Sequence, residues 1–169
     1  MEAMDAILSR RSIRKYTVDS IPENVIDELL KAAMSAPSSN NEQPWHFVVI
    51  DNRKILNDIP KFHPYSQMLT EASLAIVVCG DLLLEKGKGW WVQDCSASTQ
   101  NILIAANAKG LGAVWLGVYP REQRVEGIRK LLGLPEHIIP LCIVSIGYPA
   151  ERKPPANRYD PARVHHNKW

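Results

Sequence analysis

The run Leu74-Ala75-Ile76-Val77-Val78-Cys79, followed by Gly80, is the longest uninterrupted apolar stretch in the chain. Its length, its β-branched residues and the glycine that closes it predict a buried strand. Three further stretches with the same bias, at residues 46–51, 113–119 and 141–148, predict three more strands. Since a membrane-spanning helix needs roughly 20 apolar residues, we expect none in this chain.

The segments before and between these strands have sequence patterns typical of helices. The tetrad Ser20-Ile21-Pro22-Glu23 is typical of a capping box at the start of a helix, and this helix must end before Pro37. A long helical stretch follows at about residues 91–109 and a shorter one at 121–132. Helical connections favour parallel neighbouring strands, so we expect an α+β or mixed α/β domain with helices on both faces of its sheet.

The size and composition of the chain fit one domain that spans residues 1–169. Its 169 residues are 46% hydrophobic and 22% charged, which excludes a disordered tail protein or a coiled coil. A net charge of +2 does not call for a nucleic acid or an acidic membrane as partner. Residues 149–169 carry four prolines and are expected to form a C-terminal extension, either a loose tail or an arm laid across a partner subunit. The apolar Val164 and Trp169 favour the arm.

The cysteines and the N-terminal residues suggest a cytoplasmic protein. Cys79, Cys95 and Cys142 lie in apolar stretches, are odd in number and lack the paired spacing of zinc ligands. We therefore expect buried thiols in a reducing compartment. The first residues carry acids where a signal peptide needs a basic region, so we expect no export.

Three segments could carry chemistry, and the first two are polar. The segment Arg10-Arg11-Ser12-Ile13-Arg14-Lys15 places four cations and a hydroxyl within six residues. This combination suits a phosphate or another compact anion, although a solvated basic helix end is the plainer interpretation. Residues 36–45 form a loop of hydroxyls and amides between prolines, suited to the plane of a heterocycle, with an ordinary connection as the alternative.

The third segment, residues 110–117, reads Gly-Leu-Gly-Ala-Val-Trp-Leu-Gly. Its glycine spacing differs from the dinucleotide fingerprint, and it enters a strand where that fingerprint leaves one. Gly117 instead lets a flat group approach main-chain donors closely. The chain also lacks the G-x-S-x-G, G-x-x-x-x-G-K-[ST] and H-E-x-x-H motifs, and its histidines are scattered, so we expect no metal site. An enzyme built on this chain must borrow its reactive group.

Together these segments resemble the nitroreductase family of FMN-dependent oxidoreductases, from about residue 4 to the end of the chain. The resemblance implies an α+β fold with a mainly antiparallel or mixed central sheet covered by helices. It also implies a homodimer that binds two FMN molecules at the subunit interface, with the C-terminal arm extending onto the partner subunit.

The resemblance assigns roles to the basic residues. Arg10 and Ser12 would hold the phosphate and ribityl chain of FMN, with Arg11 beside them. Arg14 would reach the N1 and O2 edge of the flavin, where a guanidinium stabilises the negative charge of the reduced form. Arg158 is the best match to a second phosphate ligand, and Arg163 is its rival.

The other two segments receive roles around the ring. The residues expected to reach the ring and ribityl chain from the partner subunit are Pro37, Ser38, Ser39 and Asn41. Main-chain groups of Trp115, Leu116 and Gly117 would face its N5 and O4 side. Trp90 and Trp91 either wall the substrate pocket or anchor packing. A family position that is often an amide or a lysine falls near residues 65–67.

The function implied is the transfer of reducing equivalents from NAD(P)H through N5 of FMN to a nitroaromatic, a quinone or a similar electron-poor acceptor, with ping-pong kinetics. Catalysis would rest on the cofactor rather than on a side chain. The alternatives are reductive dehalogenation or flavin fragmentation on the same fold, and a nucleic-acid-binding module that uses residues 10–15. The sequence leaves the acceptor and the choice between NADH and NADPH open.

Overall fold

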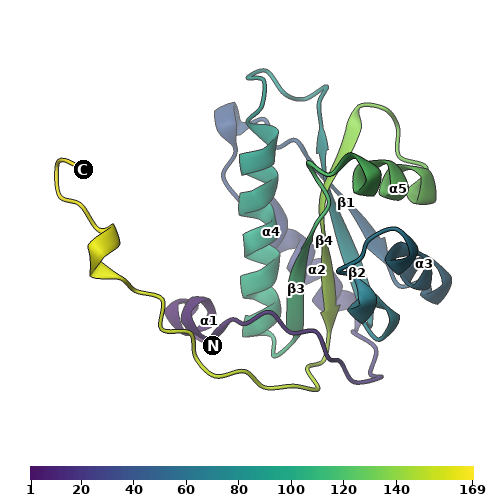
Figure 1. Cartoon of the computed structure of the whole chain (residues 1–169), viewed down its shortest axis with the longest axis horizontal. Coiled ribbons are helices and arrows are strands. Elements are labelled where there is room, and N and C mark those ends of the chain that lie inside the picture. Colours follow the sequence, from purple (N-terminus) through teal and green to yellow (C-terminus); the bar gives the residue numbers. More distant parts are fainter.

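The apolar runs pair into one four-stranded sheet in the computed structural model, which describes residues 1–169 (Figure 1). The strands are β1 (Trp45–Ile50), β2 (Leu74–Asp81), β3 (Gly112–Gly117) and β4 (Ile138–Gly147). Their order across the sheet is β1-β2-β4-β3, so β1 and β3 are the edges. The four predicted strands are therefore confirmed, with ends that differ by at most three residues.

Every neighbouring pair in the sheet is antiparallel, so the expectation of parallel neighbours is wrong. The long helix between β2 and β3 does return the chain to the start of the sheet, and these two strands run in the same direction. However, β4 pairs with both of them and separates them. The connection is thus a crossover between strands that are not neighbours, and the mainly antiparallel sheet that the family resemblance implied is confirmed.

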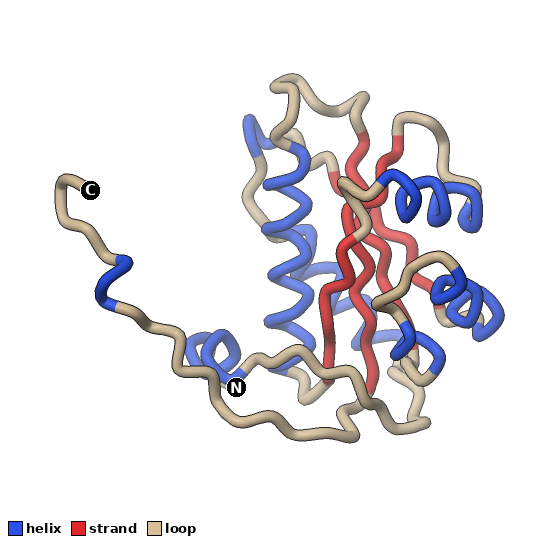
Figure 2. Tube along the Cα trace, viewed as in Figure 1, coloured by secondary structure: helices blue, strands red, loops and turns tan.

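Helices cover both faces of the sheet, as Figure 2 shows. One face packs against α2 (Glu23–Met34) and α4 (Trp91–Ala108), and the other against α3 (Arg53–Asp58) and α5 (Glu122–Leu132). Alternate residues of β2 enter opposite layers, Ile76 toward α4 and Val77 toward α5, and both are fully buried. Burial on both faces explains why this strand is uniformly apolar rather than alternating.

The sequence signals missed two helices and misplaced one cap. The short helices α1 (Ala3–Ser9) and α3 were not predicted, although Asn52 caps α3 by accepting hydrogen bonds from the amides of Lys54 and Ile55. The capping box at Ser20 is wrong, because α2 begins at Glu23 directly after Pro22. The carbonyl of Pro22 accepts the first helical hydrogen bonds, and no side chain caps this helix.

The basic segment lies along the free edge of β3, where the C-terminal residues meet it. Ser12 forms a parallel bridge with Ala113, and the amide of Ile13 donates to the carbonyl of Ala113 at 3.1 Å. On the other side of this segment, the amide of Ala150 donates to the carbonyl of Lys15 at 2.9 Å. The basic segment is therefore held between β3 and residues 149–154.

Beyond residue 154 the chain leaves the body of the molecule. Figure 1 shows this yellow tail running past α1 into open space. Tyr159, Val164 and Trp169 are exposed, and Trp169 stacks only on His165 of the same tail. Apolar side chains left in solvent in this way fit an arm that another surface covers, which remains a prediction for this chain.

The three cysteines are free and buried, as the sequence predicted. Burial raises the pKa of the Cys79 and Cys142 thiols to about 12 and also raises the pKa of Cys95. None of the helices is both long enough and apolar enough to cross a membrane. No group of three or more His, Cys, Asp or Glu side chains is arranged to hold a metal ion.

Glu151 fixes the base of the tail, which makes its attachment sensitive to acid. Its Oε1 accepts the amide of Arg14 at 2.6 Å, and this hydrogen bond, with a contribution from Lys153, lowers the pKa of Glu151. A lowered pKa in the folded state means that the contact is present above the ordinary pKa of 4.5 and is lost as pH falls through the lowered value. We expect hydrogen-exchange protection of the Arg14 amide, measured by NMR, to fall below about pH 4.5.

The variant Glu151→Gln tests the same contact at neutral pH. A neutral amide accepts a weaker hydrogen bond than a carboxylate, and solvent screens this exposed contact, so we expect a loss of protection at Arg14 of roughly twofold to threefold at pH 6. Equal protection in the variant and the parent chain would contradict this assignment.

Candidate functional site

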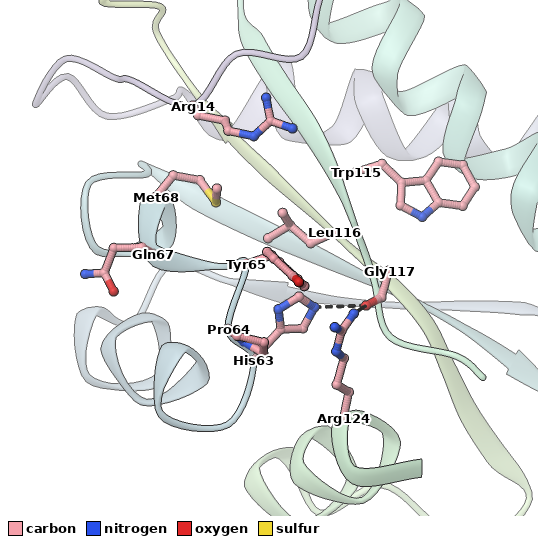
Figure 3. Close-up of a pocket in the computed structure, with 10 residues that line it drawn as sticks. All are labelled: Arg14, His63, Pro64, Tyr65, Gln67, Met68, Trp115, Leu116, Gly117 and Arg124. Atoms are coloured by element: carbon pink, nitrogen blue, oxygen red, sulfur yellow. Dashed lines mark hydrogen bonds between the residues drawn. The ribbon is translucent and has the colours of Figure 1, made fainter. Parts of the chain in front are cut away.

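A cleft of about 400 Å³ opens beside the free edge of β3 (Figure 3). One wall is β3 itself, and the opposite wall is the segment from His63 to Met68. Arg124 of α5 closes one end, and Arg14 approaches the other. The lining residues are Arg14, His63, Pro64, Tyr65, Gln67, Met68, Trp115, Leu116, Gly117 and Arg124.

The free edge of β3 presents main-chain groups to this cleft. Both main-chain groups of a residue in an antiparallel strand point to the same edge, and successive residues alternate between edges. Because Ala113 points away from β4 toward Ile13, Trp115 and Gly117 also point to the free edge. Leu116 turns its main-chain groups to β4 and contributes its side chain to the cleft.

The carbonyl of Gly117 is held by two donors. Nη1 of Arg124 lies 2.8 Å from this oxygen, and Nε2 of His63 lies 2.9 Å from it. The guanidinium of Arg124 also stacks over the ring of Tyr65, with its central carbon 5.3 Å from the ring centroid. The amide of Gly117 is left free at the edge, and no other atom lies within 4 Å of the place that a Cβ of Gly117 would occupy.

Positive charge dominates the cleft. Arg14 and Arg124 line it from opposite ends, and neither guanidinium is paired with a carboxylate. Burial and the charge of Arg124 lower the pKa of His63, so its ring is neutral near pH 7. A cleft with two unpaired guanidinium groups favours an anionic ligand or one that gains negative charge during a reaction.

A second group of cations lies next to this cleft along the basic segment. Burial and the nearby charges of Arg158 and Arg11 lower the pKa of Arg10. The charge of Arg158 in the tail therefore acts on Arg10. Arg163 instead forms an ion pair with Asp160, its Nε lying 3.1 Å from Oδ2. Mutually repelling arginines without a carboxylate partner are suited to bind an anion such as a phosphate.

Arg11 differs from its neighbours, because its guanidinium is occupied by main-chain carbonyls. Its Nε donates to the carbonyl of Pro154 at 2.8 Å, and its Nη1 donates to those of Leu8 and Arg10. Its Nη2 is buried without a partner. Arg11 therefore joins α1 to the base of the tail and leaves one free donor beside Arg10.

The loop at residues 37–43 lies on the opposite side of the sheet, beside the first turns of α4. The amide of Ser39 donates to Oδ1 of Asp94 at 2.9 Å, and Oγ of Ser38 accepts the amide of Gln43 at 3.0 Å. Asn41 and Gln43 have positive φ angles of 54° and 50°, so the turn is tight and held from within. One chain alone does not bring this loop into the cleft.

Comparison with known proteins identifies the family to which this chain belongs. A model of the nitroreductase family matches residues 7–67 and 62–148 of the chain. The chain belongs to the nitroreductase family. A protein of Methanothermobacter thermautotrophicus, provisionally named an NADH dehydrogenase/NAD(P)H nitroreductase, is 54% identical over 169 residues, which are 100% of this chain and 88% of that protein.

Solved structures agree with this family assignment. An FMN-dependent nitroreductase from Clostridium difficile has a TM-score of 0.91 and 32% identity, with 98% of this chain and 99% of that chain covered. A provisionally named nitroreductase from Desulfovibrio desulfuricans, solved in complex with FMN, has a TM-score of 0.86 and 27% identity. The match covers 100% of this chain and 98% of the Desulfovibrio desulfuricans chain.

The nitroreductase fold brings the predicted residues into three places rather than one. Arg14, Trp115, Leu116 and Gly117 line the cleft. The phosphate candidates Arg10, Arg11, Ser12 and Arg158 lie along the adjoining edge of β3 and the tail. The candidates Pro37, Ser38, Ser39 and Asn41 stand apart beside α4.

Several cleft residues escaped the sequence signals. His63 and Arg124 belong to no motif, and only the folded chain brings them to Gly117. Gln67, within the stretch where the family amide was expected, does line the cleft. Trp90 and Trp91 do not line it, and Trp91 is a packing residue that lies over Gly80 and makes a T-shaped ring contact with Tyr119.

Proposed function

We propose that this chain is an FMN-dependent oxidoreductase that takes reducing equivalents from NAD(P)H and passes them to a nitroaromatic, a quinone or a similar electron-poor acceptor. The observation that carries the proposal is the continuity of the arginine group at Arg10 with the free edge of β3 and its electropositive cleft. Family membership and the FMN named for relatives support the same cofactor.

The residues present fit this cofactor in chemistry and in space. Arg10 and Arg158 supply unpaired guanidinium groups for a phosphate, and Ser12 beside them supplies a hydroxyl. The amides of Trp115 and Gly117 point to the free edge, and the space beside Gly117 admits a flat ring. Arg14 would place positive charge at the ring, where it stabilises the anionic reduced form.

When bound, FMN supplies the redox chemistry, accepting a hydride from NAD(P)H and passing the electrons on to the acceptor. The protein's contribution is to bind and orient, since no side chain in the cleft is an activated nucleophile. Because one cleft must receive donor and acceptor in turn, we expect ping-pong kinetics.

The proposal includes a homodimer in which each cleft is completed by the partner. Pro37, Ser38, Ser39 and Asn41 lie outside the cleft of their own chain, and a second copy is the simplest source of these residues. The exposed apolar side chains of the tail also support contact with a second copy. Sedimentation of the flavin-loaded protein measures this state, and a stable monomer that keeps its flavin and activity would contradict it.

The direct test of function is spectroscopic. We expect the purified chain to retain or bind FMN, to lose the flavin absorbance when NADH or NADPH is added without oxygen, and to recover it with a nitroaromatic or a quinone. A colourless protein that cannot be loaded with FMN would refute the proposal.

Arg14→Ala should lower the midpoint potential of the bound flavin. A guanidinium near the reduced ring contributes on the order of 1.4 kcal/mol, which corresponds to about 30 mV for a two-electron couple. Potentiometric titration measures this shift, with Arg121→Ala as a control that removes an arginine outside the cleft. An unchanged potential in Arg14→Ala would reject its assigned role.

A further inference from the structure

His63 is a buried polar residue at the cleft to which the proposed function gives no role. Its side chain is part of the cleft wall, but the residue is only 1% exposed (Figure 3). Its Nε2 lies 2.9 Å from the carbonyl oxygen of Gly117, and its Nδ1 is buried without a partner. Burying a polar side chain is unfavourable unless it is hydrogen-bonded, so the contact with Gly117 is the place to look for the role of His63.

The chemistry of the contact fixes the state of the ring. A carbonyl oxygen only accepts hydrogen bonds, so Nε2 must carry the hydrogen. Burial lowers the pKa of His63, and the ring is therefore the neutral tautomer with hydrogen on Nε2. His63 thus donates to Gly117 without placing a charge in the cleft.

The main chain of His63 is itself anchored, which makes the ring a rigid support. Its amide donates to the carbonyl of Ile59 at 3.0 Å, and its carbonyl accepts Oγ of Ser66 at 2.7 Å. The same short segment carries Gln67 and Met68 into the cleft. The hydrogen bond to Gly117 therefore joins the two walls of the cleft directly.

Gly117 is a position where such support matters. Glycine has no Cβ and loses more conformational freedom on folding than any other residue. Its carbonyl is held by His63 and Arg124, and the next amide, that of Val118, donates to the carbonyl of Leu141 at 3.1 Å. The amide of Gly117 shares its peptide plane with the carbonyl of Leu116, which turns to β4. With the peptide groups on both sides of Gly117 fixed, its free amide keeps one direction at the edge of β3.

We propose that His63 is a positioning residue, whose Nε2–H holds the Gly117 carbonyl so that the Gly117 amide faces the flavin and the two cleft walls keep their separation. The proposal rests on the proposed function, because the flavin is the group that this amide would meet. His63 acts through Gly117 and does not take part in the chemistry itself.

Two variants of His63 separate positioning from packing. His63→Leu fills the space without a donor, whereas His63→Gln can place an amide N–H near the position of Nε2. We expect His63→Leu to lower kcat about tenfold with a smaller change in KM and to shift the flavin absorbance bands, because misplacement near the reacting atoms is costly. His63→Gln should restore kcat to within about threefold of the parent chain. His137→Leu, outside the cleft, should change neither property.

The flavin-free protein provides a separate readout. Nitrogen-15 NMR at pH 7 should show a neutral His63 ring with hydrogen on Nε2, and His63→Leu should lower exchange protection near Val118. A charged ring, or hydrogen on Nδ1, would overturn the inference independently of flavin binding.

The flavin-loaded protein separates the two proposals. If the parent chain binds FMN but His63→Leu keeps its absorbance bands and kcat, the positioning role is overturned while the proposed function stands. If the parent chain binds no FMN, the proposed function and the positioning role are both refuted.

Discussion

Arg10→Ala is expected to weaken the binding of FMN by one to two orders of magnitude. A charge-assisted hydrogen bond contributes about 1.5 to 3 kcal/mol, which corresponds to a change of roughly 10- to 150-fold in Kd. The guanidinium of Arg10 is available for this bond, because it makes no ion pair within the chain. Fluorescence titration of the flavin-free protein with FMN measures the change.

The same substitution should affect the flavin-free fold in the opposite direction. Burial, Arg158 and Arg11 lower the pKa of Arg10, which means that its charge destabilises the folded state at neutral pH. Removing that charge should leave the free energy of unfolding of the flavin-free protein unchanged or slightly higher. An arginine whose removal weakens cofactor binding but not the fold belongs to a binding site.

Matched arginines of the tail distinguish a phosphate site from general electrostatic attraction. Arg158→Ala should weaken FMN binding to a degree similar to Arg10→Ala, because the two charges are coupled. Arg163→Ala should not, since Arg163 is paired with Asp160. Equal losses for Arg158→Ala and Arg163→Ala would show that the tail attracts FMN only through its total charge.

The sequence predicted the elements of this fold better than their arrangement. Apolar runs located all four strands, because burial of a strand leaves a local mark on composition. The position of β4 between β2 and β3 leaves no such mark, since it depends on pairing between residues far apart in the chain. A rule about helical connections therefore predicted parallel neighbours, and the sheet is antiparallel.

The candidate site shows the same difference between features with a local sequence signal and features that depend on long-range contacts. Arg14 and Gly117 stand in motifs with unusual local composition, and the sequence could single them out. His63 meets Gly117 across 54 positions, and a lone histidine in a loop carries no signal of that contact. The preference for Arg158 over Arg163 stays a prediction, and the structure adds to it the ion pair of Arg163 with Asp160, which lies within one short turn that the sequence did not predict.

Gly112→Ala should displace the whole basic segment, residues 10–15. A Cβ at this position would lie 2.6 Å from Cγ2 and 2.8 Å from Cβ of Ile13. Because the Cβ of Ile13 moves only with its main chain, rotation of the Ile13 side chain cannot remove this clash. The segment that carries Arg10, Ser12 and Arg14 must shift away from β3, since Ile13 is bonded there to Ala113.

Two effects of Gly112→Ala are therefore expected together. Overpacking should lower the free energy of unfolding by about 1 to 3 kcal/mol, and displacement of the basic segment should weaken FMN binding at least about tenfold. Gly127→Ala in α5 is the matched control, because its added Cβ would collide with the ring of Phe62, away from the basic segment. It should lower stability to a similar degree and leave the Kd for FMN unchanged. Weakened binding in both variants would mean that loss of stability alone releases FMN, and that close contact between Ile13 and β3 does not shape the site.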